Sequence, residues 1–351
     1  MPSNHPISEA LIAWYKKNKR DLPWRHTKDP YKIWLSEIML QQTQVVQGLS
    51  YYLKFTETFP TIIDLANAPE DQVMRLWQGL GYYSRARNLH ATAKIVAKDY
   101  KGKFPTTYST IKELKGVGDY TAAAIASIAY DLPHAVVDGN VYRVLARLFN
   151  SNTPINSTEG KKEFQELANE LLDTKKAALH NSALMEYGAL VCKPQNPKCD
   201  ECVLNQFCLA YKNNTVGLLP VKTNKLKIKN RYFHYFVLNH KNSVYIEKRT
   251  DKDIWQNLYQ FYLIETDEDA SETTVLKKLK SNLKLSKFVV DEITKQKKHI
   301  LSHQHLYATF YEITTSDVIK STSLIKIQRN KLNDFGMPQL INKYLNLQSK
   351  N

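Results

Sequence analysis

The chain has 351 residues, and its 49 lysines and arginines against 34 aspartates and glutamates give a formal net charge of +15. Such a charge favours binding to the phosphates of nucleic acid, and less often to an anionic membrane surface. No apolar stretch approaches the roughly 18 residues that a membrane-spanning helix needs. The N-terminus, MPSNHPISEA, lacks the pattern of a secretory signal. We therefore expect a soluble, cytoplasmic, nucleic-acid-binding protein.

The chain is predicted to be helical from residue 6 to about residue 190. Apolar residues recur there at intervals of three and four, and proline or glycine separates the segments. The segments with this spacing are Ser8–Lys19, Tyr31–Phe59, Ala68–Gly79 and Arg85–Lys98.

A Gly-x-Gly turn, Gly116 to Gly118, precedes the predicted helix Thr121–Tyr130. Glycines let backbone N–H groups approach an anion, and a helix N-terminus favours negative charge. The turn therefore suits a DNA phosphate, although an ordinary turn between two helices has the same pattern.

Two carboxylates in the helical part are candidates for acid–base chemistry. Glu37 lies in the apolar segment WLSEIMLQQT, with no Lys or Arg three or four positions away to pair with it. A carboxyl group in such surroundings has a raised pKa and can act as a general acid; the alternative is an ordinary exposed glutamate. Asp138 precedes the predicted helix Tyr142–Phe149, where it is either a second functional carboxylate or only a helix cap.

All four cysteines of the chain lie in one loop with the spacing C-x6-C-x2-C-x5-C. Gathered thiolates suit an iron–sulfur cluster or zinc. Disulfides would need an oxidising compartment, and zinc sites usually combine two close cysteine pairs, of which this loop has one. We expect a [4Fe–4S] cluster held by Cys192, Cys199, Cys202 and Cys208.

A different pattern begins after Tyr211, where a lysine-rich tether, Lys222 to Lys229, precedes short β-type runs and two helical patches. The runs are Tyr232–Leu238, Val244–Glu247, Phe261–Glu265 and Tyr307–Ile313, and the patches are Thr273–Leu285 and Leu340–Leu347. We therefore expect an all-α domain over residues 1–213, a linker over 214–229 and an α+β domain over 230–351.

Five ordered segments resemble a known family: SEIMLQQTQV, GLGYYSRARNL, LKGVGDYTAAAI, VVDGNVYRVLAR and the cysteine loop. Together they are similar to the helix–hairpin–helix DNA glycosylases with a [4Fe–4S] cluster, and most closely to the adenine DNA glycosylases of the MutY type. The resemblance covers most of the chain. It implies hydrolysis of the N-glycosidic bond of adenine mispaired with 8-oxoguanine or guanine in double-stranded DNA, by a monomer on the bacterial nucleoid.

The resemblance also assigns roles to individual residues. Glu37 protonates the base and Asp138 stabilises the sugar cation. The remaining contacts fall on Arg25 for adenine, Asn140 and Tyr120 beside Asp138, Gln42 and Tyr82 in the base stack, and Gly116 and Gly118 at a phosphate. Endonuclease III-like lyases have a Schiff-base lysine where this chain has Tyr120, so a hydrolytic glycosylase is expected. An endonuclease III-like glycosylase and lyase, or a non-catalytic iron–sulfur DNA-binding protein, remain the alternatives.

The C-terminal domain resembles a Nudix domain, as in the MutY-type enzymes. Between Gly217 and Gly336 the chain has no glycine, so the glycine-dependent phosphohydrolase box is missing and hydrolase activity there is not expected. The family's Phe-Ser-His loop, which reads 8-oxoguanine, corresponds to Leu301–Ser302–His303. Leucine replaces the aromatic residue, and Ser302 and His303 remain as the polar readers.

Overall fold

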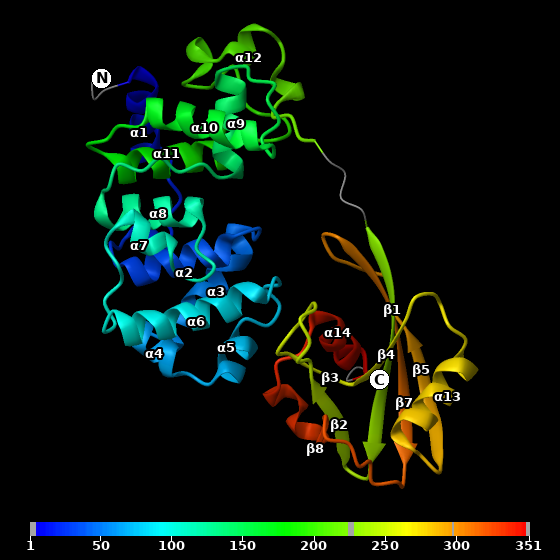
Figure 1. The fold of residues 1–351 in the computed structure, drawn as a ribbon. Coiled ribbons are helices and arrows are strands. Elements are labelled where there is room, and N and C mark those ends of the chain that lie inside the picture. Colours follow the sequence, from blue (N-terminus) through cyan, green and yellow to red (C-terminus); the bar gives the residue numbers. More distant parts are fainter. Residues whose placement is uncertain (1–4, 224–227, 297, 349–351) are drawn as a thin grey trace. The chain divides into compact units, whose positions relative to one another are not determined.

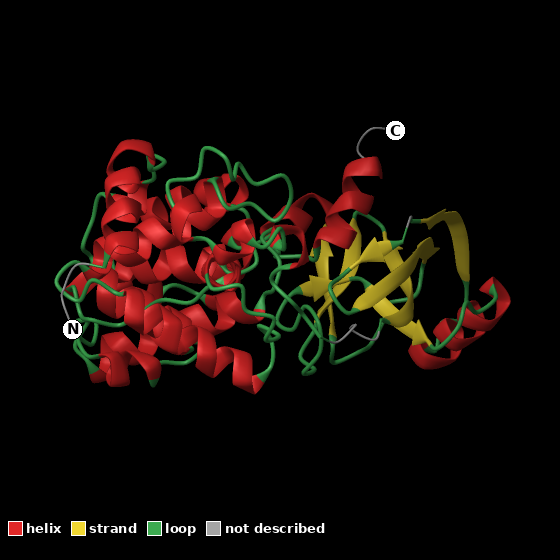
Figure 2. Ribbon diagram, turned by 90° about the horizontal axis from the view of Figure 1, so that it is seen from above, coloured by secondary structure: helices red, strands yellow, loops and turns green. Residues whose placement is uncertain are grey.

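The computed structural model describes residues 5–223, 228–296 and 298–348 (Figure 1). Within it the chain forms two compact units, one of residues 1–67 and 88–224 and the other of residues 68–87 and 225–351. The strands all belong to the second unit, whereas the first is built from helices and loops (Figure 2). Among the described residues no helix is long and apolar enough to cross a membrane.

The helices of the first unit follow the predicted periodicity with one break. Their bounds are α1 Pro6–Asn18, α2 Pro30–Leu40, α3 Val45–Thr58, α4 Ile62–Asn67, α6 Ser84–Asp99 (from residue 88 on), α7 Tyr108–Lys112, α8 Asp119–Tyr130, α9 Gly139–Leu148, α10 Thr158–Leu171, α11 Ala177–Leu190 and α12 Leu209–Lys212. The single helix expected over Tyr31–Phe59 is two helices, because Gln42 adopts a left-handed φ of 53° that an α-helix cannot contain.

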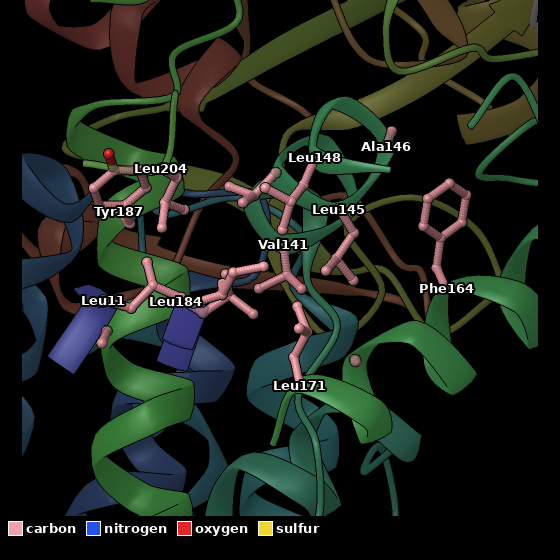
Figure 3. Close-up of a cluster of buried hydrophobic side chains, with 14 of the residues drawn as sticks. Leu11, Val141, Leu145, Ala146, Leu148, Phe164, Leu171, Leu184, Tyr187 and Leu204 are labelled. Atoms are coloured by element: carbon pink, nitrogen blue, oxygen red, sulfur yellow. The ribbon is translucent and has the colours of Figure 1, made fainter. Parts of the chain in front are cut away.

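One hydrophobic cluster joins α1, α9, α10 and α11 (Figure 3). Leu11, Leu145, Phe164 and Leu184 are among its fully buried members. Burial of such a side chain contributes about 1.5–3 kcal/mol, so the cluster fixes α9 firmly. The N-terminus of α9, where Asp138 lies, is therefore held by the core of this unit.

Helix α8 packs against α2, α7 and α11. The alanines from Ala122 to Ala126 are buried, and their small side chains allow the neighbouring helices to come close. This packing brings the start of α8, with Tyr120, to the middle of α2, with Glu37.

The segment expected to be a linker is partly packed. Arg147 of α9 donates from Nε to the carbonyl oxygens of Val216 (3.0 Å) and Leu219 (3.2 Å), and the amide of Ile155 donates to Val221 O. The helical unit therefore extends beyond residue 213, at least to Thr223, whose amide donates to Asn156 Oδ1. Of the lysine-rich tether, residues 224–227 lie outside the described part of the chain.

The second unit is a mixed sheet with helices. Its strands are β1 Lys229–His240, β2 Ser243–Lys248, β3 Tyr259–Gln260, β4 Tyr262–Thr266, β5 Phe288–Lys295, β6 His299–Ile300, β7 Gln304–Thr315 and β8 Leu324–Gln328. The central order is β3-β2-β1-β7-β5. Strands β1 and β7 are parallel, and the other pairs are antiparallel.

The helices of the second unit are α5 Glu70–Leu76, α13 Glu272–Leu283 and α14 Gln339–Gln348. Helix α14 lies on the sheet, where Tyr344 stacks on Phe310 with ring centroids 4.1 Å apart. Strands β5 and β8 were not predicted, because their mixed exposure gives no alternation of apolar and polar residues.

Residues 68–87 were expected in the helical domain but group with the second unit. Polar contacts explain this: Lys248 Nζ lies 2.7 Å from Asp71 Oδ1, and Asn257 Nδ2 donates to Glu70 Oε1 over 2.6 Å. These pairs join residues that are far apart in the chain, so no local sequence pattern predicts them.

Candidate active site

Glu37 lies on α2 and is only 8% exposed. The hydroxyl group of Tyr120, from α8, donates a hydrogen bond to its Oε2 atom. Burial raises the pKa of Glu37 to about 7, although the Tyr120 hydrogen bond and the charge of Arg25 act in the opposite direction. The prediction of a buried carboxyl group with a raised pKa is thus confirmed.

Asp138 is the N-cap residue of α9, as its position suggested. Its Oδ1 atom accepts from the amides of Asn140 (2.8 Å) and Val141 (2.7 Å), and its Oδ2 atom accepts from Asn140 Nδ2 (2.9 Å). Burial raises the pKa of Asp138, while these donors and the charge of Arg143 restrain the rise. The charge of Asp138 also raises the pKa of Glu37, so this helix cap lies close enough to Glu37 to act on it electrostatically.

A cavity of about 610 Å³ is lined by Glu37, Tyr120, Asp138, Asn140 and Arg25, together with Trp24. Ligand pockets usually measure about 300–1,000 Å³ and combine apolar walls with a few polar groups. A larger cavity of about 1080 Å³ also includes Tyr120 and Asp138, and reaches Gln42 and Gly118. The two carboxyl groups thus line a space whose volume is that of a small-molecule pocket.

Arg25 lies in this cavity but is already paired. Its Nη1 and Nη2 atoms donate to the two carboxylate oxygens of Glu186, at 2.8 and 2.5 Å. Arg20 binds the same carboxylate with Nε and Nη2, at 2.9 and 2.6 Å. Burial alone would raise the pKa of Glu186, but the two arginines lower it to about 2.

Glu186 was not predicted, although a signal was present. It is the only acidic residue of α11 and has neither Lys nor Arg three or four positions away. The same criterion singled out Glu37. Its partners Arg20 and Arg25 lie 166 and 161 residues earlier in the chain, so only the fold distinguishes the two glutamates.

The two glycines of the predicted hairpin differ in whether packing requires a glycine at that position. Gly116 has a φ of 79°, and a Cβ atom there would lie 2.8 Å from Asn88 Cβ. Gly118 is the N-cap of α8, and a Cβ atom there would meet nothing within 4 Å. Packing therefore requires glycine only at Gly116, whereas Gly118 leaves open space in front of the first turn of α8.

Gln42 and Tyr82 both have left-handed backbones, with φ of 53° and 47°. This conformation is uncommon outside glycine, and such residues cluster at functional sites. Gln42 lines the larger cavity. Tyr82 is 44% exposed, and its hydroxyl group is hydrogen-bonded to Ser302 Oγ within the second unit.

The loop Leu301–His303 connects β6 to β7. The amide of Leu301 donates to Gln304 O over 2.8 Å, and the amide of Lys229 donates to His303 O over 3.0 Å. The side chains of Ser302 and His303 are exposed. The predicted readers therefore sit at the tip of a turn whose base is tied to β1.

The four cysteines are free thiols that line one small cavity of about 30 Å³. Arg147 Nη1 lies 3.4 Å from Cys192 Sγ, and Tyr187 Oη lies 2.9 Å from Cys202 Sγ. Within the described residues no three Cys, His, Asp or Glu side chains converge as a single metal ion requires. The four sulfurs surround one hollow, and cysteine thiolates are the ligands that an iron–sulfur cluster takes.

Helix α9 links the cysteine loop to Asp138. Arg143 Nη2 donates to Asn140 Oδ1 (3.0 Å) and to Gly188 O (2.7 Å), and its Nε atom donates to Cys192 O (2.7 Å). Asn140 in turn holds Asp138. A continuous series of hydrogen bonds therefore runs from the cysteine loop to the carboxylate of Asp138.

Three family matches cover these regions. Residues 35–172 match the HhH-GPD superfamily of base excision DNA repair proteins, residues 192–208 the iron–sulfur binding domain of endonuclease III, and residues 234–347 the NUDIX domain. The second match begins and ends on a cysteine, and the third confirms the Nudix-like fold of the C-terminal part.

Two relatives match along nearly the whole chain. An adenine DNA glycosylase of Buchnera aphidicola subsp. Baizongia pistaciae is 39% identical over 302 residues, which are 85% of this chain and 83% of the relative. One of Buchnera aphidicola subsp. Schizaphis graminum is 33% identical over 97% of this chain and 98% of its own.

The solved structure of a thermostable thymine-DNA glycosylase matches with a TM-score of 0.55 and 32% identity, over 59% of this chain and 95% of that one. It is thus similar to a little over half of this chain, whereas the two relatives extend over nearly all of it.

Proposed function

Because the chain belongs to the adenine DNA glycosylase family of base excision repair, we propose that it excises adenine paired with 8-oxoguanine or guanine in duplex DNA. The observation that carries the proposal is the pair of carboxyl groups on one cavity. Glu37 has a pKa near 7, and Asp138 is held by three N–H donors. General acid catalysis is most efficient when the pKa of the acid lies near the working pH.

Glu37 is the proton donor in this proposal. An adenine leaves the sugar readily only after a ring nitrogen has been protonated, and a carboxyl group with a pKa of about 7 is partly protonated at neutral pH. After proton transfer the carboxylate keeps the hydrogen bond from Tyr120. It can then accept a proton from the attacking water.

Asp138 stabilises the other fragment. As the N-glycosidic bond breaks, the sugar becomes oxocarbenium-like, and an oriented carboxylate beside C1′ lowers the energy of this cation. The three N–H donors favour the ionised form of Asp138 and fix its direction. No residue then has to move when the charge develops.

With Tyr120 in the place of a lysine, the reaction is hydrolysis and not a lyase reaction. A Schiff-base lyase needs an amine beside the sugar, and a phenol cannot form an imine. Burial raises the pKa of Tyr120 well above its ordinary value, so the phenol keeps its proton and serves as a donor to Glu37. A monofunctional glycosylase follows from this position.

The remaining walls receive the flipped base. A base inside the duplex cannot reach Glu37, so it must leave the stack. Arg25 and Trp24 line the cavity that would accept it. Gln42 and Tyr82, on exposed left-handed turns, are the residues that would enter the vacated stack.

The positive charge and the cysteine loop serve binding to DNA. A side chain at Gly118 would meet no neighbouring atom, so the glycine leaves room there for a phosphate at the N-terminus of α8. Cys192, Cys199, Cys202 and Cys208 would hold the [4Fe–4S] cluster of this family. The cluster would shape the loop and supply no electron to the hydrolysis. Binding to duplex DNA would place the protein, as a monomer, on the nucleoid.

The lesion is read by the C-terminal domain. The hydroxyl of Ser302 and the imidazole of His303 are exposed, and they can meet the N7 donor and the O8 acceptor that distinguish 8-oxoguanine from guanine. Leu301, half-buried, gives no aromatic contact.

A single-turnover assay tests the proposal on duplexes that carry adenine opposite 8-oxoguanine, guanine or thymine. The expected result is excision of adenine opposite the first two and not opposite thymine, with an intact abasic strand as the product. Equal excision from all three duplexes would contradict the mispair specificity. Strand cleavage without alkali would contradict the hydrolytic assignment.

A further inference from the structure

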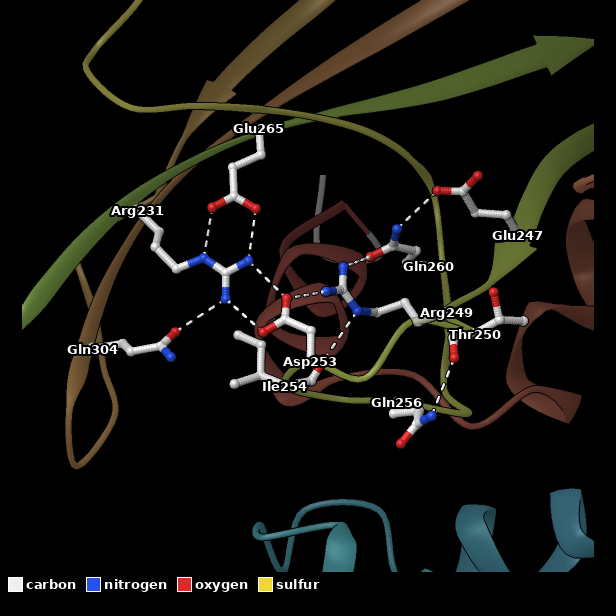
Figure 4. A network of polar contacts seen from close by, with 10 residues as sticks. All are labelled: Arg231, Glu247, Arg249, Thr250, Asp253, Ile254, Gln256, Gln260, Glu265 and Gln304. Carbon is white, nitrogen blue, oxygen red and sulfur yellow. Dashed lines mark hydrogen bonds and ion pairs between the residues drawn. The ribbon is translucent and has the colours of Figure 1, made fainter.

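Arg231 is buried and is the centre of an ionic cluster in the second unit (Figure 4). The side chains of its partners Asp253 and Glu265 are 31% and 35% exposed. Its guanidinium group binds Glu265 with Nε and Nη2, both over 2.6 Å. The same group binds Asp253 with Nη1 (2.9 Å) and Nη2 (2.7 Å). Two carboxylates thus hold one guanidinium by paired hydrogen bonds, which fixes its plane.

Arg249 and Gln260 extend the cluster. Arg249 donates to Asp253 Oδ2 and to Gln260 Oε1, each over 2.8 Å, and Gln260 donates to Glu247 Oε1 over 2.8 Å. Burial by itself would lower the pKa of Arg231, but Glu265 and Asp253 raise it, so the guanidinium stays charged. A network with this many paired groups is rigid.

The cluster reaches the loop Leu301–His303 through one further bond. Arg231 Nη1 donates to Gln304 Oε1 over 3.2 Å, and Gln304 follows His303 directly (Figure 4). The backbone of the same strand pair holds the loop at its base, since the amide of Lys229 donates to His303 O and that of Leu301 to Gln304 O. The loop tip is exposed while its base is bound to a fixed guanidinium.

We propose that Arg231, acting through Gln304, is a positioning residue that holds Ser302 and His303 in the geometry that distinguishes 8-oxoguanine from guanine. This inference rests on the proposed role of the loop. The two bases differ at only two neighbouring atoms, so discrimination depends on small displacements of the readers.

The ionic cluster is better explained by the orientation that it gives to Gln304 than by a contribution to the free energy of unfolding. An ion pair with a partly exposed carboxylate adds little to the free energy of unfolding, and even a fully buried pair is often matched by apolar residues of the same volume. An apolar cluster, however, could not direct an N–H group at Gln304. The fork of Arg231 binds two carboxylates and still has a donor left for the residue beside the loop.

The decisive variant is Gln304→Met, which keeps the length of the side chain and removes the oxygen that Arg231 binds. Affinities are measured for duplexes that carry a non-hydrolysable adenine nucleotide opposite 8-oxoguanine or guanine. The preference for 8-oxoguanine should fall by about tenfold, which corresponds to about 1.4 kcal/mol. The single-turnover rate opposite guanine, at saturating enzyme, should stay unchanged.

Arg329→Met is the matched control. Arg329 also pairs with a carboxylate of the second unit, Glu312, and its guanidinium group donates to Glu312 and Asn239. This variant should keep the full preference for 8-oxoguanine. If it lost the preference as strongly as Gln304→Met does, the effect would be a general loosening of the domain, and the positioning role would be refuted.

Two further variants separate the possible failures. In Gln304→Asn the shorter side chain no longer reaches Arg231. This variant provides the same comparison if Gln304→Met does not fold. Ser302→Ala tests the reader itself. Full preference in both Gln304 variants with a reduced preference in Ser302→Ala would refute the positioning role alone. If wild type and Ser302→Ala both lacked a preference, the proposed recognition by this loop would fail.

Discussion

Glu37 and Glu186 are two buried glutamates that line one cavity, and their acidities differ by several orders of magnitude. Glu37, on α2, has a phenol as its hydrogen-bond partner and a pKa of about 7. Glu186, on α11, is bound by two arginines and has a pKa of about 2. Burial raises the pKa of both, so the partners decide which glutamate is an acid and which is a fixed anion.

This difference predicts that the cavity needs one glutamate that donates a proton and one that stays ionised. A proton donor next to an uncompensated guanidinium would lose its proton too easily, because Arg25 lowers the pKa of Glu37. Glu186 binds Arg25 and offsets part of its charge.

Glu37→Gln should produce the largest loss. The amide keeps the shape of the side chain but cannot protonate the base, and general acid catalysis is worth about 10²–10⁴-fold. Single-turnover excision opposite 8-oxoguanine should therefore fall by at least this factor, while the affinity for the duplex changes little. A rate within about threefold of wild type would reduce Glu37 to a packing residue.

Asp138→Asn separates the two roles of Asp138. Asparagine is as good an N-cap as aspartate, so the helix α9 should keep its stability and the thermal midpoint should stay near that of wild type. Excision should nevertheless fall by roughly 10²-fold or more, because one well-placed electrostatic contact is worth about that in catalysis. Activity that survived the loss of the charge would leave Asp138 with its capping role alone.

The pH dependence of the wild-type rate reports the acidity of Glu37. The acid form is the active one, so the single-turnover rate should fall as pH rises through about 7, approaching a tenfold decrease per pH unit above it. At low pH the rate should fall again, since Asp138 must be ionised to act. A rate that stayed constant between pH 6 and pH 9 would exclude Glu37 as the proton donor.

Glu186→Gln should have the smallest effect on the single-turnover rate. Its effect should depend on pH, which distinguishes it from the other variants. With the carboxylate gone, the charge of Arg25 acts on Glu37 without its counter-ion and lowers the pKa of that group further. The alkaline limb of the pH profile should move to lower pH, and the rate at pH 8 should fall about threefold to tenfold, since one pKa unit changes the protonated fraction about tenfold.

The control for this variant is the rate at a pH below the limb, where Glu37 remains protonated in both proteins. The two rates should converge there. A constant factor between the two proteins at every pH would mean that Glu186 supports only the shape of the cavity and not the acidity of Glu37.

Much of the site could be predicted because its residues lie in short local patterns. Glu37 in an apolar helix, Asp138 before a helix, the hairpin glycines and the four-cysteine loop each occupy fewer than about twenty residues. The α+β character of the C-terminal part followed in the same way from alternating runs. The edge strands β5 and β8 could not be predicted, because half-exposed strands lack that alternation.

The sequence by itself determined the residue types and their local frames: a buried acid on α2, a cap on α9, a phenol in the place of a lysine, and one loop with every thiol. Only the tertiary structure decided their partners. It placed Tyr120 on Glu37, two N-terminal arginines on Glu186, and Arg231 behind the loop of Ser302. Helical and strand periodicity acts over a few residues, whereas these pairings join segments that only the packing of the core brings together.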